Sequence, residues 1–218
     1  MNRLLFEKRG DAVWISHLDL MRVFQRTFRR AGFLLKHTGG FNQHAYVSLA
    51  LPLSVGTESG CEIMDFELEH EFAPEELKDR LNAALPAGIR VLEVYESACK
   101  LKELTHLHTR VMLEYDNGAS EETEAALREL FDRAELPVEK KTKRGMAVVD
   151  LKPMIAYLKV ERVSRQELCL DAVVCAQNPS LNPAQLVTAI EVHAPEHKPD
   201  FAKCSRVEVL KADRTCFR

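Results

Sequence analysis

The clearest chemical pattern in this sequence is a set of four arginines, Arg22, Arg26, Arg29 and Arg30. If residues 16–31 form a helix, at about 100° per residue the four arginines fall within an arc of about 100°, and an apolar stripe falls opposite them. A guanidinium is planar and donates two parallel hydrogen bonds, which suits a phosphate. A solvated charged face usually mixes signs, whereas this one has only Asp19 as a counter-charge. The pattern therefore favours phosphate binding, with an ordinary solvated face as the alternative.

A glycine-bearing segment follows the arginines and reads His37-Thr38-Gly39-Gly40-Phe41-Asn42-Gln43-His44. Paired glycines let backbone amides approach an anion or a ligand. The Phe41 ring suits stacking on an unpaired base, and Asn42 suits base-edge contacts. The alternative is a structural loop whose Phe41 packs into the core. The predicted RNA-binding set is Arg22, Arg26, Arg29, Arg30, Gly39, Gly40, Phe41, Asn42 and His44.

Ser16, His17 and Asp19 form a second group with possible chemistry. His17 is suited to act as a general acid or base, with Ser16 and Asp19 in support. The same spacing also matches a helix N-cap at Ser16 followed by a capping-box acid at Asp19. On the helical wheel His17 falls on the apolar side. Two hypotheses remain open: a catalytic His17, and a buried, hydrogen-bonded His17.

The cysteines do not indicate a metal or cofactor site. Six are scattered along the chain, and no two form a Cys-x-x-Cys pair or an iron–sulfur spacing. We interpret them as reduced thiols and expect neither metal nor cofactor. No run approaches the ~18 apolar residues that a membrane span needs. The N-terminus becomes charged too early for a signal peptide, so we expect a cytoplasmic chain without membrane contact.

Charge is distributed unevenly along the chain, although its formal net value is only −3. Residues 1–50 contain eight basic and three acidic residues, whereas residues 51–80 contain two basic and nine acidic ones. Such asymmetry can focus a positive field on one face. If the acids of 58–79 paired with the arginines, RNA binding would lose its basis.

The predicted elements occur in the order β-α-β-β-α-β in each half. In the first half, the strands are 3–8 (with 12–15 as a hairpin partner), 45–52, 61–69 and 89–94, and the helices are 16–31 and 74–85. In the second half, the strands are 110–115, 146–151, 168–176 and 206–211, the helices are 121–134 and 183–193, and 139–145 is a basic turn. This order predicts an α+β chain of two tandem ferredoxin-like (βαββαβ) halves, residues 1–102 and 103–218.

Several segments resemble one bacterial family: residues 15–24 (Ile-Ser-His-Leu-Asp-Leu-Met-Arg-Val-Phe), 28–32, 40–44, 51–56 and, in the second half, 150–155. The chain resembles the bacterial radical-SAM-linked protein family, a domain of unknown function. It departs from the usual family pattern at Gln43 and Ala45, where the family has proline. The resemblance implies a radical SAM enzyme as partner. Because this chain lacks an iron–sulfur motif, it would be the separately encoded, accessory type.

Together these patterns favour an RNA-binding accessory protein that presents tRNA or rRNA to a radical SAM modifying enzyme. One alternative is a metal-independent RNA-processing enzyme that uses His17 as general acid or base. Another is a protein-interaction module that docks the radical SAM enzyme through the acidic 58–79 region without contacting RNA.

Overall fold

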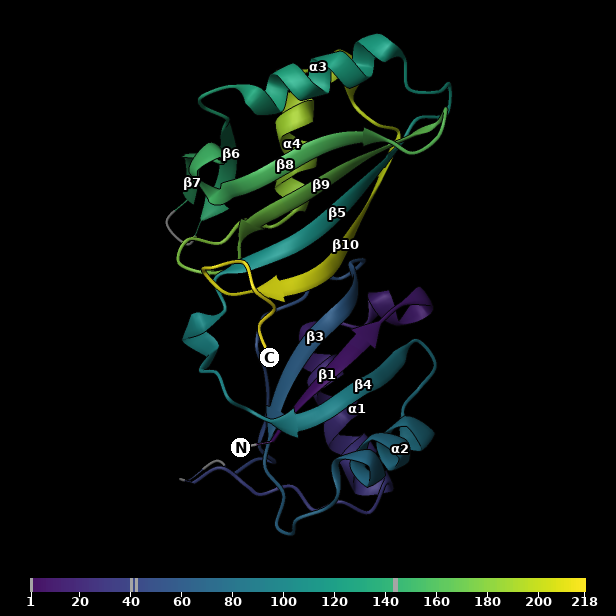
Figure 1. Cartoon of the computed structure of the whole chain (residues 1–218), viewed down its shortest axis with the longest axis vertical. Helices are drawn as coiled ribbons and strands as arrows, with labels where there is room; N and C mark the ends of the chain where they lie inside the picture. Colours follow the sequence, from purple (N-terminus) through teal and green to yellow (C-terminus); the bar gives the residue numbers. More distant parts are fainter. Residues whose placement is uncertain (1, 40, 42, 143–144) are drawn as a thin grey trace. The chain divides into compact units, whose positions relative to one another are not determined.

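A computed structural model describes residues 2–39, 41, 43–142 and 145–218. The fold is α+β, as predicted. The chain divides into two compact units, Met1–Glu103 together with Phe217–Arg218, and Leu104–Cys216 (Figure 1). Each unit combines an antiparallel sheet with two α-helices.

The first unit contains β1 (Asn2–Lys8), α1 (His17–Arg30), β2 (Val47–Leu49), β3 (Glu58–Phe66), α2 (Pro74–Ala84) and β4 (Ile89–Glu96). Strand β1 lies between β4 and β3, β2 pairs with β3, and each of these pairs is antiparallel. Both helices pack on one face of this sheet (Figure 1), and the buried core lies between them and the strands.

Helix α1 begins and ends where the sequence predicts. The Ser16 hydroxyl accepts a hydrogen bond from the Asp19 amide (3.2 Å), which satisfies one free amide of the first turn. Gly32 adopts a left-handed conformation (φ +77°) just after the helix, a common way for helices to end. On the inner side, Phe24 contacts Phe6 of β1 with ring centroids 4.8 Å apart, so ring packing holds α1 against the sheet.

The predicted strand at 12–15 is wrong, because Gly10–Trp14 forms a 3-10 helix. The buried Lys8 ammonium donates hydrogen bonds to the carbonyls of Val13 (3.1 Å) and Ile15 (2.8 Å). A side chain therefore uses carbonyls that a hairpin strand would have needed. Strand β2 is also shorter than predicted.

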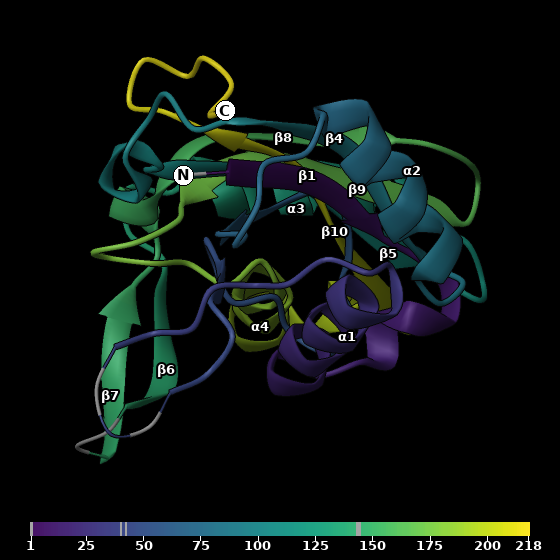
Figure 2. The same ribbon diagram turned by 90° about the horizontal axis from the view of Figure 1, so that it is seen from below.

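The second unit contains β5 (His106–Glu114), α3 (Glu121–Asp132), β6 (Pro137–Thr142), β7 (Gly145–Asp150), β8 (Ile155–Arg162), β9 (Glu167–Cys175), α4 (Ala184–His193) and β10 (Phe201–Leu210). Its sheet has the antiparallel order β10-β5-β9-β8. Strands β6 and β7 pair only with each other, in a hairpin that stands apart from these four strands (Figure 2).

Two predictions for this unit are corrected. The segment 146–151 was expected in the main sheet, but it forms β7 of the hairpin, and β8 occupies the sheet position. Most of the predicted basic turn at 139–145 is strand β6, whereas residues 143–144 lie outside the described residues. The apolar pattern misled here because Met146 and Val148 of β7 are exposed, whereas the sheet-edge strand β8 carries the exposed polar Lys159.

Candidate nucleic-acid interface

The outer face of α1 carries all four predicted arginines. Arg22, Arg26, Arg29 and Arg30 are exposed, whereas Leu20, Phe24 and Phe28 on the opposite side are at most 1% exposed. The helix therefore presents a cationic face to solvent, and its apolar face is used for packing.

Arg22 is paired with an acid of its own helix. Its guanidinium donates to Asp19 (2.9 Å), and both side chains are more than half exposed. The Ser16 hydroxyl donates to the other oxygen of the same carboxylate (2.7 Å). These hydrogen bonds, with that of Ser16 the stronger influence, hold the pKa of Asp19 below its usual value. An exposed pair of this kind is weak, and an incoming phosphate can compete for Arg22.

Arg30 has a structural role. One terminal nitrogen of its guanidinium donates to the carbonyl of Ala84 (2.7 Å) and to the hydroxyl of Thr27 (3.2 Å). These contacts connect the end of α1 to the end of α2. Arg30 is therefore a poorer phosphate ligand than the sequence pattern predicts.

Arg26 and Arg29 have no hydrogen bond or ion pair with any residue in the described part of the chain. Four of the nine acids of 58–79 form ion pairs with other residues: Asp65 with Arg3, Glu67 with Lys36, Glu75 with Lys78, and Glu76 with Arg80. None of these ion pairs uses an arginine of α1. The four-arginine set thus narrows to two unneutralised residues, Arg26 and Arg29, next to a weakly paired Arg22.

The proposed catalytic group around His17 is not assembled. Ser16 and Asp19 hydrogen-bond to each other, and neither bonds to His17. His17 is half-buried at the first position of α1, and its Nδ1 atom is buried without a hydrogen-bond partner among the described residues. The hydrogen bond expected of a buried histidine is therefore absent at Nδ1 among the described residues.

The loop after α1 is closed at its base by Thr38 and His44. The Thr38 amide donates to the His44 carbonyl (2.9 Å), and the His44 amide donates to the Thr38 hydroxyl (3.2 Å). Phe41 is fully exposed, which rules out its packing into the core. Gly39 has open space where a Cβ would lie, so no neighbour requires glycine there. The predicted residues Gly40 and Asn42 lie outside the described residues.

Two exposed apolar residues at the start of α1 were missed from the sequence. Trp14 is 70% exposed and Leu18 is 67% exposed. Leu18 precedes Arg22 by four residues, so helical spacing places it on the arginine face. That spacing was the available signal for Leu18. The exposure of Trp14 depends on the path of the chain around it, for which the sequence gives no comparable signal.

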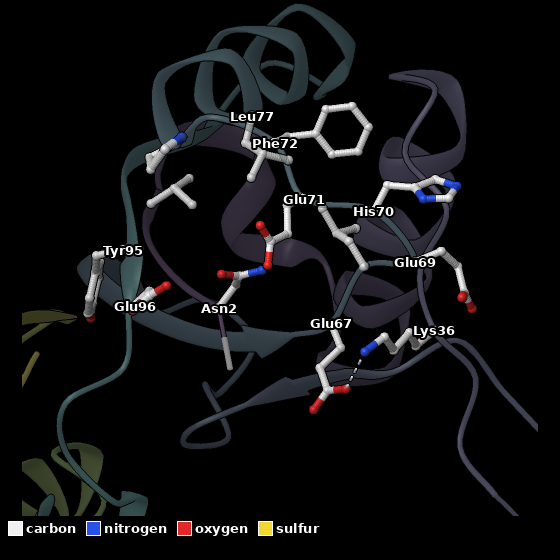
Figure 3. A pocket seen from close by; sticks show the side chains of 13 residues that line it. Asn2, Lys36, Glu67, Glu69, His70, Glu71, Phe72, Leu77, Tyr95 and Glu96 are labelled. Atoms are coloured by element: carbon white, nitrogen blue, oxygen red, sulfur yellow. Dashed lines mark ion pairs between the residues drawn. The ribbon is translucent and has the colours of Figure 1, made fainter.

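A cavity of about 550 Å³ also lies in the first unit (Figure 3). Glu67, Glu69, Glu71 and Glu96 line it, and Lys36 is paired with Glu67 at 3.7 Å. Figure 3 shows the side chains of Asn2 and Glu71 pointing toward each other within it. Because carboxylates predominate, this cavity is unsuited to phosphate.

No cluster of His, Cys, Asp and Glu suited to a metal ion occurs among the described residues.

Comparison with known proteins identifies the family. A family model matches residues 2–183, which is most of the chain. The chain belongs to DUF2344, a family described as an uncharacterized protein conserved in bacteria. The match carries no information on a radical SAM partner. No curated protein matches this DUF2344 chain.

Two solved structures have a similar fold. One is a chain of a Cbf5-Nop10-Gar1 complex, and the other is a chain of an H/ACA RNP bound to a substrate RNA containing 2′-deoxyuridine. Each has a TM-score of 0.50 and 8% sequence identity, over 95% of this chain. The DUF2344 chain spans about half of their length, 48% and 47%. At this identity the likeness shows the fold alone.

No helix in the described part of the chain is long and apolar enough to span a membrane.

Proposed function

We propose that this chain is an RNA-binding accessory protein that binds RNA phosphates through the exposed face of α1. The observation that carries the proposal is the pair Arg26 and Arg29, which are exposed and unpaired among the described residues while nearby acids pair elsewhere. The planar guanidinium group loses less entropy per hydrogen bond to phosphate than a flexible donor does, and each contact releases counterions from the RNA.

The architecture adds support. The strand orders β4-β1-β3-β2 and β10-β5-β9-β8 follow the same scheme, if the β6–β7 hairpin is taken as an insertion. We infer two tandem ferredoxin-like units, residues 1–102 and 103–218. One of the two solved neighbours is a chain of an H/ACA RNP bound to a substrate RNA. Similarity of fold favours RNA binding as a function, but it does not identify the residues that bind.

The proposal also covers the class of RNA, the partner enzyme and the loop after α1. The RNA would be tRNA or rRNA in the cytoplasm, presented to a separately encoded radical SAM modifying enzyme, as the resemblance of residues 15–56 implies. Phe41 and His44, both exposed in the loop after α1, are proposed to contact bases or ribose. Gly39, Gly40 and Asn42 are proposed in the same interface.

Docking of the partner enzyme through acidic residues is a second candidate. The observation in its favour is the cavity in Figure 3, which four glutamates line. It would suit a basic segment of a partner protein. Catalysis by His17 has weaker support, because neither Ser16 nor Asp19 bonds to it.

The direct test is the affinity of the purified protein for total tRNA and for rRNA fragments at low salt. The variant Arg26→Glu/Arg29→Glu should weaken binding by tenfold or more, since each lost phosphate contact is replaced by a repulsive charge.

A charge-matched control is Arg90→Glu/Arg133→Glu, which changes two exposed arginines that do not belong to α1. It should bind like the parent protein. Equal affinity of the parent and the α1 variant, or equal losses in both variants, would contradict the proposal. Capture of a radical SAM enzyme without RNA would support the docking candidate instead.

A further inference from the structure

Trp14 is the single tryptophan of the chain and is largely open to solvent. An ideal Cβ at Gly56 would lie 3.4 Å from the Trp14 ring, so the ring packs against the backbone of the segment after β2. Gly56 has φ +82°, a conformation that favours glycine. A side chain there would meet the ring at van der Waals distance. One part of the indole is thus supported, and 70% of the residue stays accessible.

The backbone on both sides of Trp14 is anchored. The buried Lys8 ammonium donates to the carbonyls of Val13 and Ile15, which flank the tryptophan. The Gly56 amide donates to the same Val13 carbonyl (2.9 Å). Lys8 is 0% exposed, and burial is the main cause that lowers its pKa. These bonds hold the backbone from which the ring projects, and the contact with Gly56 supports one edge of the ring. Ordering of this kind reduces the entropy lost when a ligand binds.

Leu18 is exposed on the cationic face of α1, four residues after Trp14 in the sequence. Leu18, Arg22 and Arg26 follow one another at intervals of four residues, about 6 Å along the helix axis. Asp19 partly neutralises Arg22, so the positive charge concentrates at Arg26 and beyond. The exposed surface therefore changes from apolar at Trp14 and Leu18 to cationic at Arg26 and Arg29.

We propose that Trp14 and Leu18 form a stacking platform for an unpaired base of the RNA strand whose phosphates contact Arg26 and Arg29. This inference rests on the proposed function and specifies its substrate as RNA with a single-stranded segment. An apolar protein surface would match Trp14 and Leu18 but would leave the adjoining arginines without partners. A nucleotide chain satisfies both, because a base has an apolar face and its backbone is anionic. In a continuous duplex the base faces stack on one another and cannot reach the indole.

Because Trp14 is the single tryptophan, intrinsic fluorescence reports on this site alone. The test titrates the protein with single-stranded oligo(A) and oligo(U) of about 12 nucleotides and with a blunt-ended RNA duplex that has no loop or overhang. The fluorescence anisotropy of end-labelled RNA measures binding in parallel. We expect the single strands to quench the tryptophan and to bind more tightly than the duplex.

Trp14→Ala should weaken single-strand binding by roughly 5- to 150-fold, the range for loss of one stacked base, and Trp14→Phe should retain part of the affinity. Binding of the blunt-ended duplex should be unaffected by either substitution. Thermal melting checks that the variants fold, which the exposure of the ring favours.

The outcomes separate this inference from the proposed function. RNA binding that requires Arg26 and Arg29, with unchanged fluorescence and unchanged affinity of Trp14→Ala, would overturn the stacking platform and leave the proposed function intact. Absence of RNA binding by anisotropy would overturn both. Concentration-dependent self-association that Trp14→Ala abolishes, without an effect on RNA affinity, would show that a second copy of the chain occupies the patch and would also overturn this inference.

Discussion

At the scale of single residues, hydrogen-bond and packing partners distinguish side chains that cannot be told apart from the sequence. Helical spacing predicted that four arginines share one face, and all four are exposed. It could not predict that Arg30 hydrogen-bonds to the Ala84 carbonyl, because that residue lies 54 positions further along the chain. It also could not predict that Trp14 rests on Gly56. Local periodicity predicts the direction in which a side chain points. Long-range contacts determine whether that side chain is free to bind a ligand.

Tyr95 provides a test of burial at this scale. Its hydroxyl is buried without a hydrogen-bond partner among the described residues, and burial raises the pKa of Tyr95 to about 12. The native state therefore holds this proton while the unfolded state, with a pKa near 10, loses it. The contribution of Tyr95 to stability is present below pH 10 and is lost as the pH rises from 10 to 12.

Tyr95→Phe removes this titration. The free energy of unfolding, measured in urea from pH 7 to 12, should fall less steeply above pH 10 for the variant than for the parent protein. At pH 7 the variant should be as stable as the parent or more so, since an unpartnered hydroxyl is lost. A large loss of stability at pH 7 would instead mean that the hydroxyl makes a stabilising contact.

At the scale of elements, capping and core packing made α1 predictable. Ser16, Asp19 and Gly32 are recognisable from the sequence as helix-end residues, and the structure confirms the helix between them. The elements that were predicted incorrectly are those with ambiguous hydrophobic patterns. Strand β8 has half-exposed residues, and β7 has exposed apolar ones, so burial could not be inferred from the pattern.

Ser16→Ala should destabilise the protein by roughly 0.5–2 kcal/mol through loss of the N-cap. The matched control is Ser120→Ala in α3, where Ser120 accepts from the Thr123 amide (3.0 Å) in the same way. Urea unfolding compares the two. Ser16→Ala should cost at least as much as Ser120→Ala, because the second hydrogen bond of Ser16 goes to a carboxylate, whereas that of Ser120 goes to the Thr123 hydroxyl (3.0 Å). A neutral Ser16→Ala beside a destabilising Ser120→Ala would contradict this account of α1.

At the scale of the whole molecule, a net charge of −3 conceals a locally cationic surface. Four of the nine acids of 58–79 form ion pairs with Arg3, Lys36, Lys78 and Arg80, and none of these ion pairs involves Arg26 or Arg29. A nearly neutral protein can therefore still bind a polyanion through one helix. The charge imbalance was visible in the sequence, but which residues pair could be learned only from the fold.

The salt dependence of RNA affinity tests the central claim most directly. The logarithm of the association constant for a single-stranded RNA, plotted against the logarithm of salt concentration, has a slope of about −0.7 for each neutralised phosphate. Arg26→Ala/Arg29→Ala should therefore make the slope shallower by about 1.4, while the control Arg90→Ala/Arg133→Ala should leave it unchanged. The same slope in the parent protein and the α1 variant would contradict phosphate binding by this helix.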